Sequence, residues 1–451
     1  MDSLLIGFAG LGVLVLLIGL RMPIAYSMIL VGGVGVTILN GPDIFFSQLK
    51  TLAYGQFSTY DLSVVPMFVL MGNISTKAGL STALFRAASV WLGWMRGGVA
   101  MSAIAACAGF GAVCGSSLAT ASTMGQVALP ELKRYKYADS LATGTLAAGG
   151  VLGILIPPSV VLVIYAVIVE ANIVTMFMAA MIPGIIAVIL FLLTIAIYVR
   201  IRPDAGPAGR LADRAEFLDA TLNVIPVAVI FGLVIGGIYF GYFNPTPAAA
   251  IGVFLVWVYG TLRGFVKIAE MKDALLDTAK TTGMIYLILL GAEMLKIFMS
   301  RGGVPQAMAE WMANSGLSPM VIMIILLAAL IFLGMLMDSL SMILLAVPFF
   351  WPVLVEINGG DFVDAANAGY GMTSEELKIW FGILALIVVE LGLITPPVGM
   401  NVFVISAMAK DVPMKETFIG VIPFFVAELV RVSILVAFPT ITLWLPRVLS
   451  G

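Results

Sequence analysis

Two short polar clusters interrupt long apolar stretches of the sequence, and both contain atoms that bind small cations. The first cluster is Ser116, Ser117 and Thr120, and the second is Asp338, Ser339 and Ser341. Hydroxyl, carboxylate and carbonyl oxygens are the ligands that hard cations take in proteins. Polar residues at membrane depth mark ion or substrate pathways, so both clusters are candidate binding sites.

Two double prolines supply further candidate ligands. Ser159 follows Pro157-Pro158, whereas Pro396-Pro397 lies between Thr395 and the pair Gly399 and Asn401. A proline within a helix removes a backbone donor and clashes with the preceding turn, so both helices must unwind here. At membrane depth, freed carbonyls persist only where protein or a ligand covers them. Such carbonyls favour sodium, and the N-terminal ends of half-helices favour a carboxylate.

Several of these side chains also have a structural interpretation. Ser and Thr in membrane helices commonly bond back to their own helix. Asp338 is equally suited to binding sodium and to capping the second arm of its hairpin. Glu390 precedes Gly392 at the second break. It is either a cytosol-accessible ligand for a proton or an ion, or the partner of a cation elsewhere in the fold.

The reactive residues that most enzyme classes need are absent from the sequence or unsuitably placed. The sequence has no His, which removes His proton relays, His metal ligation and Ser/His or Cys/His catalysis. Cys107 and Cys114 would lie about 10 Å apart on a helix, beyond disulfide reach, and are interpreted as packing residues. No basic run indicates nucleic-acid binding. Two intramembrane couples have i,i+3 spacing and should neutralise themselves, namely Glu293 with Lys296 and Glu428 with Arg431.

The elements that position these groups must be membrane helices. Of 451 residues, 61% are hydrophobic and 11% are charged, against roughly 25% charged in soluble domains, and the mean hydropathy is +1.11. A bilayer core of about 30 Å needs roughly 20 helical residues per crossing. We therefore predict an all-α polytopic membrane protein. The crossings are expected at about 4–20, 23–40, 62–76, 139–169, 174–199, 220–240, 246–262, 281–299, 377–404 and 417–446.

Two further apolar stretches, about 97–129 and 317–355, are interrupted by Gly, Ser, Asp and Pro and are predicted to be re-entrant helical hairpins. With the N-terminus outside, most Lys and Arg lie on the cytoplasmic side, as the positive-inside rule requires. The exceptions outside are Lys50, Arg301, Lys378 and Arg447. If either hairpin were a single crossing, every later loop would lie on the opposite side of the membrane and its Lys and Arg residues would break the positive-inside rule. The rule therefore supports both hairpins.

The two halves of the sequence resemble each other. The segment 111–117 corresponds to 334–340 at the two hairpins, and 152–158 corresponds to 391–397 at the two double prolines. Because the first half contains an odd number of crossings, the second half must enter the membrane in the opposite sense. An inverted-topology repeat is typical of secondary transporters. Chance similarity between Gly- and Pro-rich apolar segments is the alternative.

Three runs resemble the large membrane (permease) subunit of TRAP transporters, the tripartite ATP-independent periplasmic family. They are GFGAVCGSSLAT at 109–120, GGVLGILIPPS at 149–159 and ELGLITPPVGMNVF at 390–403. The resemblance covers nearly the whole chain. It implies a sodium-driven elevator of the bacterial inner membrane, with a periplasmic N-terminus, that imports an organic acid without any cofactor except the coupling sodium. A four-carbon dicarboxylate, a sialic acid and a keto acid remain compatible.

The resemblance also implies two partners, which we expect to be separate chains. One is a small four-helix membrane subunit, and the other is a soluble periplasmic substrate-binding protein. The long acidic insert with Asp361, Asp364, Glu375 and Glu376 departs from the shorter connection usual in this family. It lies on the predicted outer face, either as a solvated loop or against the binding protein.

Carried over by motif, the resemblance implies the following site residues. The first sodium site comprises Gly115, Ser116, Ser117, Gly153 and Pro157, and the second comprises Asp338, Ser339, Thr395, Pro396 and Gly399. The substrate lies near Thr120, Ser159 and Asn401, with Glu390 as a candidate coupling residue. The expected division is a first scaffold helix pair and arm (1–60), a first transport half (61–203), a second scaffold pair (204–275) and a second transport half (276–451).

Two other function classes fit the same sequence. One is a stand-alone elevator carrier of dicarboxylates or an inorganic anion, which needs no binding protein. The other is a channel or a structural membrane component without coupling. Uptake by this chain alone would favour the first, and currents far above roughly a thousand ions per second would favour the second.

Overall fold

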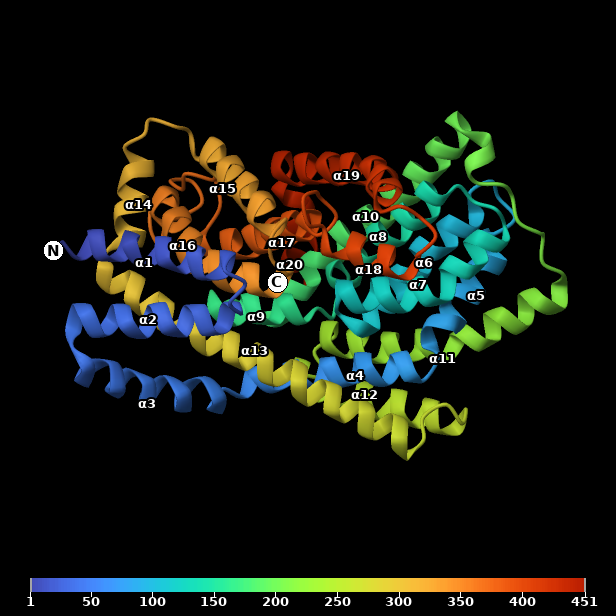
Figure 1. Ribbon diagram of the computed structural model, residues 1–451, viewed down its shortest axis with the longest axis horizontal. Helices are drawn as coiled ribbons and strands as arrows, with labels where there is room; N and C mark the ends of the chain where they lie inside the picture. Colours follow the sequence, from blue (N-terminus) through green and yellow to red (C-terminus); the bar gives the residue numbers. More distant parts are fainter. Residues whose placement is uncertain (1, 450–451) are drawn as a thin grey trace.

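The computed structural model describes residues 2–449, and every regular element in that range is helical (Figure 1). The first half contains α1 (Ser3–Gly19), α2 (Ile24–Asn40), α3 (Pro42–Ser58), the 3-10 helix η1 (Tyr60–Ser63), α4 (Val64–Lys77), α5 (Leu80–Leu92), α6 (Gly98–Cys114), α7 (Ser117–Arg134), α8 (Asp139–Leu155), α9 (Val160–Ile168), α10 (Ile173–Ile201) and η2 (Pro203–Ala205). The second contains α11 (Arg214–Tyr239), α12 (Pro245–Leu262), α13 (Ile268–Gly302), α14 (Val304–Ala313), α15 (Pro319–Gly334), α16 (Ser339–Asn358), α17 (Ser374–Gly392), α18 (Met400–Met408), α19 (Met414–Ala437) and α20 (Pro439–Leu449).

The helices agree with a multi-pass membrane protein. Within the described residues, six helices are long and apolar enough to cross a bilayer, or seven if the bent pair α8 and α9 is one span. Helices α1 and α2, which we predicted to cross, have 17 residues each. At about 1.5 Å per residue they are slightly shorter than a core of about 30 Å. The count of ten crossings therefore stays a prediction.

Two predicted boundaries are wrong. The apolar run 417–446 is not one helix, because α19 ends at Ala437 and α20 begins at Pro439. Proline disfavours helical geometry in the residue before it, and Phe438 accordingly leaves the helix with φ −128° and ψ 74°. The run 281–299 is only part of α13, which has 35 residues and begins in polar sequence.

Each predicted hairpin is a pair of helices joined by a short turn. Helix α6 ends at Cys114 and is followed by Gly115, whose φ of 64° favours glycine. The next residue, Ser116, caps α7 by accepting a hydrogen bond from Ala119 N. Between α15 and α16, Asp338 caps α16 by accepting from Ser341 N. Local capping chemistry therefore fixes where each second arm begins.

Both double prolines lie outside helices, as predicted. Helix α8 ends at Leu155, α9 begins at Val160, and the two helices are bent by 46°. Helix α17 ends at Gly392, and α18 begins at Met400. The peptide bonds Pro157-Pro158 and Pro396-Pro397 are both cis.

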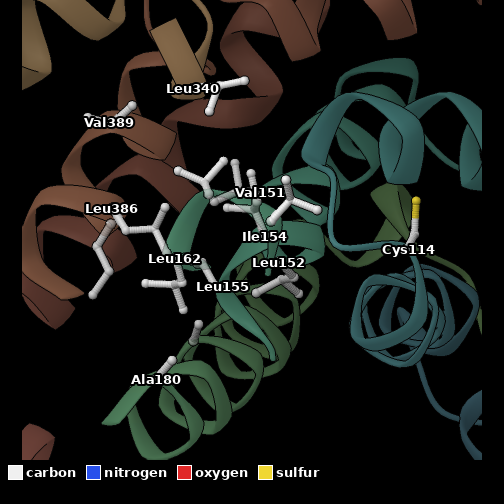
Figure 2. Close-up of a cluster of buried hydrophobic side chains, with 14 of the residues drawn as sticks. Cys114, Val151, Leu152, Ile154, Leu155, Leu162, Ala180, Leu340, Leu386 and Val389 are labelled. Carbon is white, nitrogen blue, oxygen red and sulfur yellow. The ribbon is translucent and has the colours of Figure 1, made fainter. Parts of the chain in front are cut away.

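Protein surrounds the first break. Every residue of α8 from Ser140 to Leu155 is buried. Figure 2 shows Val151, Leu152, Ile154 and Leu155 of α8 in an apolar cluster whose other labelled members include Leu162, Ala180, Leu340, Leu386 and Val389. These neighbours belong to α9, α10, α16 and α17. The unwound backbone is thus embedded among helices, where irregular structure is tolerated at membrane depth.

The same close helix contact occurs in both halves of the chain. A Cβ added at Gly111 of α6 would lie 2.4 Å from the Gly153 Cα in α8. In the second half, a Cβ added at Gly392 of α17 would lie 2.7 Å from the Gly334 Cα in α15. In the sequence repeat, Gly111 corresponds to Gly334 and Gly153 corresponds to Gly392. Each hairpin therefore packs against the neighbouring broken helix through a pair of glycines.

A second group of helices lies along the long α13. Figure 1 shows α13 running beside α2 and α4, and both pairs are in contact. The Asn73 amide of α4 donates to Thr278 Oγ1 of α13 over 2.9 Å, and Tyr286 donates to Leu62 O over 3.1 Å. Helix α13 thus connects the N-terminal helices to α4. The division of the chain into scaffold and transport halves stays a prediction.

The acidic insert is an ordered connection held by Asn358. The buried Asn358 side chain donates to Met372 O and Ser374 Oγ and accepts from Tyr370 N. Two of the insert's four acids form ion pairs with residues outside the insert. Glu376 accepts from Thr373 N at the start of α17 and pairs with Arg447, while Glu375 pairs with Lys378.

Candidate functional site

A cavity of about 270 Å³ lies between the tips of the two hairpins. Its wall combines the start of α7, the start of α16 and the start of α9 with faces of α4 and α13. The polar lining residues are Asn73, Ser116, Ser117, Thr281, Asp338 and Ser339. Among the described lining residues, Asp338 is the only charged one. The cavity therefore offers oxygen ligands and negative charge, which suits a cation.

The first predicted sodium cluster is brought together by the fold. A Cβ added at Gly115 would lie 2.9 Å from Pro158 O, next to Pro157. A Cβ added at Gly153 would lie 2.7 Å from Ser116 O. Both glycines thus allow the hairpin backbone to approach the first broken helix. The carbonyls of Ser116 and Pro158 lie at this contact, although Ser116 O already accepts from Thr120 N.

The second predicted cluster is brought together only in part. Asp338 Oδ2 accepts from Ser341 N over 3.1 Å, and Asp338 Oδ1 accepts from Ser341 Oγ over 2.6 Å. The capping interpretation of Asp338 is therefore realised, although this residue also lines the cavity. Ser339 Oγ donates to Glu390 Oε1 rather than to a residue of the second double proline.

The residues around the second double proline bond locally. Thr395 Oγ1 donates to Leu391 O over 2.6 Å, which is the structural alternative noted for such hydroxyls. Pro396 is exposed. Gly399 has a φ of 62° and immediately precedes α18. Among the described hydrogen bonds, none joins these three residues to Asp338 or Ser339. Their role as sodium ligands stays a prediction.

The three residues predicted near the substrate are fully buried. Ser159 accepts from Leu162 N and caps α9. A Cβ added at Gly153 would lie 2.3 Å from Thr120 Oγ1, and one added at Gly150 would lie 3.1 Å from Asn401 Nδ2. Thr120 and Asn401 thus both lie against α8, behind the cavity wall rather than on it.

Glu390 is completely buried in α17. Its Oε1 accepts from Ser339, the Ser117 hydroxyl also interacts with its carboxylate, and its Oε2 has no partner among the described residues. The role of Glu390 as a coupling residue therefore stays a prediction. The side chain is not accessible to the cytosol, and no Lys or Arg in the described range forms an ion pair with it.

The two charged couples form as predicted. Glu428 and Arg431 pair with side chains that are 1% and 0% exposed, and Arg431 also donates to Pro183 O of α10. The Lys296 Nζ lies 3.7 Å from Glu293 Oε1. Each couple stays on one helix, as i,i+3 spacing requires.

Sequence reasoning missed three features of the site. Asn73 and Thr281 line the cavity, and their only sequence signal is a polar residue within a predicted crossing.

The Lys133 ammonium pairs with Asp411 and lowers the pKa of that carboxyl. This pair joins the end of α7 to the loop after α18, so the hairpin and the second broken helix are linked beyond the membrane-spanning segments.

Together, the helical spans, the embedded first break and the cavity with its polar lining residues define a polytopic membrane protein with a cation-compatible site. The sequence matches the family described as "Tripartite ATP-independent periplasmic transporter, DctM component" over residues 11–441. The chain therefore belongs to the family of large permease subunits of TRAP transporters. Members of this family are transport proteins, not enzymes.

Two relatives illustrate this membership. The chain is 31% identical to the C4-dicarboxylate TRAP transporter large permease of Pseudomonas aeruginosa, covering 91% of each chain. It is 30% identical to the sialic acid TRAP transporter large permease of Vibrio cholerae, covering 95% of this chain and 96% of the relative. The fold is similar to that of the YdaH transporter of Alcanivorax borkumensis, with a TM-score of 0.61, 14% identity and 88% of each chain covered.

Proposed function

We propose that this chain imports an organic acid together with sodium, as the large permease subunit of a TRAP transporter in the bacterial inner membrane. The observation that carries the proposal is the cavity between the hairpin tips. It presents hydroxyls from both halves of the chain and one carboxylate, without a basic residue among the described lining residues. Such a site favours a cation over an anion. Because the organic acid is itself an anion, it would bind here only beside a bound cation that offsets the negative charge.

The substrate class follows from the relatives. Their names specify a C4-dicarboxylate and a sialic acid, and both compounds are carboxylates. Helices α7, α9 and α16 all begin at the cavity. Their N-terminal amides carry partial positive charge, which can hold a carboxylate beside the bound sodium. We therefore propose that sodium and substrate share this region.

The proposed movement is an elevator. The two hairpins and the two broken helices would move as one unit against the helices that pack along α13. Thr281, Met284 and Ile285 of α13 face the cavity across from the hairpin tips. The site would then lie at the boundary between the moving and the fixed helices, as an elevator requires. The partners would be a small four-helix membrane subunit and a periplasmic binding protein.

Reconstitution into liposomes tests this function. The chain would be reconstituted with its small subunit, and uptake of labelled succinate or N-acetylneuraminate would be measured with the cognate binding protein outside. We expect uptake only with an inward sodium gradient. Potassium in place of sodium is the control for a gradient effect.

The outcome also separates the alternatives. Uptake by this chain alone, without the binding protein, would instead identify a stand-alone carrier. Sodium-dependent uptake that is unchanged by both Ser116→Ala and Thr395→Ala would refute the assignment of the sodium ligands.

A further inference from the structure

Apolar side chains make up more than half of the lining of the cavity between the hairpin tips. They include Val160 and Val161 at the start of α9, Val69 of α4, and Met284 and Ile285 of α13. Apolar walls hold the apolar part of a ligand, and a few polar groups fix where its polar end lies. The positions of the two kinds of residue therefore indicate the class of organic acid that fits.

The wall formed by α4 and α13 is polar at one end and apolar at the other. The two hydrogen bonds between these helices, described above, show that they are antiparallel. Val69 lies four residues before Asn73, and Met284 lies three residues after Thr281. Each displacement is about 5 Å along its helix, and both point the same way because the helices are antiparallel. Asn73 and Thr281 thus mark the polar end of the wall, and Val69 and Met284 mark the apolar end.

The polar end offers unused hydrogen-bond donors. The Thr278 hydroxyl donates its only hydrogen to Ala274 O over 2.7 Å, so it can only accept from the Asn73 amide. This arrangement fixes which way the amide faces. The second N–H of Asn73 and the hydroxyl of Thr281 form no hydrogen bond with the described residues. Both residues line the cavity, so they can donate to one carboxylate.

The apolar end is unsuited to a second carboxylate. The described lining contains no Lys or Arg, and its only acidic residue is Asp338. A cation bound at the hairpin tips can offset one carboxylate of the substrate. The second carboxylate of a C4-dicarboxylate would reach toward Val69 and Met284, where nothing in the lining compensates its charge.

The cavity also disfavours an acid with many hydroxyls. Its volume of about 270 Å³ lies slightly below the range of about 300–1,000 Å³ that is typical for drug-sized ligands, and part of it would hold the cation. The side chains of Ser116, Asp338 and Ser339 are already hydrogen-bonded to neighbours. Most hydroxyls of N-acetylneuraminate would therefore face apolar side chains, and a buried hydroxyl without a partner is unfavourable.

We propose that the preferred substrate is a small monocarboxylate with an apolar tail, such as a short-chain 2-oxo acid. Its carboxylate accepts from Asn73 and Thr281 beside the bound cation, and its tail lies against Val69, Met284 and Ile285. This inference rests on the proposed function and narrows its substrate class.

Thermal unfolding of the purified membrane complex in sodium tests the inference without the selectivity of the binding protein. Pyruvate, 2-oxobutyrate and 2-oxovalerate differ by one methylene each. The concentration that gives half of the maximal stabilisation should fall about 2- to 4-fold per methylene, because each one buries further apolar surface. Succinate and N-acetylneuraminate should need concentrations at least about 10-fold higher than 2-oxovalerate. Equal values along the series, or tighter binding of succinate or N-acetylneuraminate, would overturn the inference.

A pair of variants in α13 locates the tail. Met284→Ala should raise the half-maximal concentration of 2-oxovalerate about 10-fold but that of pyruvate by less than about 2-fold, because pyruvate lacks the tail. The matched control is Leu276→Ala, since Leu276 is 48% exposed against 54% for Met284 and lies outside the described lining. It should change neither value. Equal effects of Met284→Ala on both acids would overturn the position of the tail. Stabilisation by none of the acids, or equal stabilisation in potassium and in sodium, would instead refute the proposed function.

Discussion

At the scale of single residues, three side chains that the sequence assigned to the site carry buried polar atoms without a partner among the described residues. Thr120 Oγ1, Asn401 Oδ1 and Glu390 Oε2 all have no hydrogen-bond partner among the described residues. An unpaired buried polar atom costs about 1–3 kcal/mol. Each of these residues lies in or against the helices that carry the breaks. If these residues contact the ion or the substrate, as predicted, the ligand would satisfy this hydrogen-bonding capacity during transport.

Thr120 allows a test in which stability and function change in opposite directions. Thr120→Val keeps the shape but removes a hydroxyl that only the weakly polar Cys114 thiol adjoins. We expect the free energy of unfolding to stay the same or to rise by up to about 1 kcal/mol, because an unpaired hydroxyl is lost. Uptake should fall at least about 10-fold if the hydroxyl contacts sodium or substrate. Thermal unfolding in detergent and uptake in liposomes are the two measurements, and unchanged uptake would exclude that role.

Residue types and spacing predicted some side-chain roles but not others. The cap at Asp338, one of the two roles considered for it, depends on a neighbour within three residues, so the sequence contains the whole interaction. Ser116 and Ser159 cap helices in the same local way, although the sequence assigned them to sodium and to substrate. The contact between Ser339 and Glu390 spans 51 residues. It exists only because α16 packs against α17. The sequence around Glu390 does not show whether its side chain is buried against Ser339 or exposed to the cytosol.

At the scale of elements, most helix boundaries were predictable because proline and glycine act locally. Both double prolines and the hairpin turn at Gly115 end helices as expected. The end of α19 at Ala437 was missed, although Pro439 stands there. Apolar residues continue on both sides of this break, so hydropathy alone extended the helix. The glycine contacts between hairpins and broken helices also required tertiary structure.

The contact between α6, α7 and α8 is tight enough that one methyl group should disrupt it. A Cβ at Gly153 would lie 2.3 Å from Thr120 Oγ1 and 2.7 Å from Ser116 O. Overpacking of this kind typically costs about 1–3 kcal/mol. Gly153→Ala should therefore lower the melting temperature and abolish uptake, because the tip of the hairpin must move away from the break.

Gly283→Ala is the matched control for this change. Gly283 lies in the long α13, and a Cβ there would meet no atom within 4 Å. Alanine is favoured over glycine inside a helix by about 1 kcal/mol. This variant should be as stable as the wild type or more stable, with normal uptake. Equal behaviour of the two variants would show that the contact at Gly153 has no role in closing the site.

At the scale of the whole molecule, the arrangement of two similar halves explains why the cavity is bounded by both hairpins. The sequence repeat predicted corresponding segments, and the structure shows them in corresponding contacts through Gly111 with Gly153 and Gly334 with Gly392. The sequence could not predict that α4 and α13 complete the cavity wall. That contact depends on how the N-terminal helices pack along α13, which local patterns do not encode.

The predicted opposite orientation of the two halves can be tested by a labelling experiment on spheroplasts. Both native cysteines are buried, so single cysteines introduced at exposed positions can be labelled with little background. If each hairpin enters and leaves on one side, Arg96→Cys and Arg134→Cys should both be cytoplasmic. Ser315→Cys and Asp364→Cys should both be periplasmic. A membrane-impermeant maleimide should then label only the second pair in intact spheroplasts and all four after permeabilisation. Labelling of one member of either pair alone would show that the corresponding hairpin crosses the membrane once, and would end the inverted-repeat interpretation.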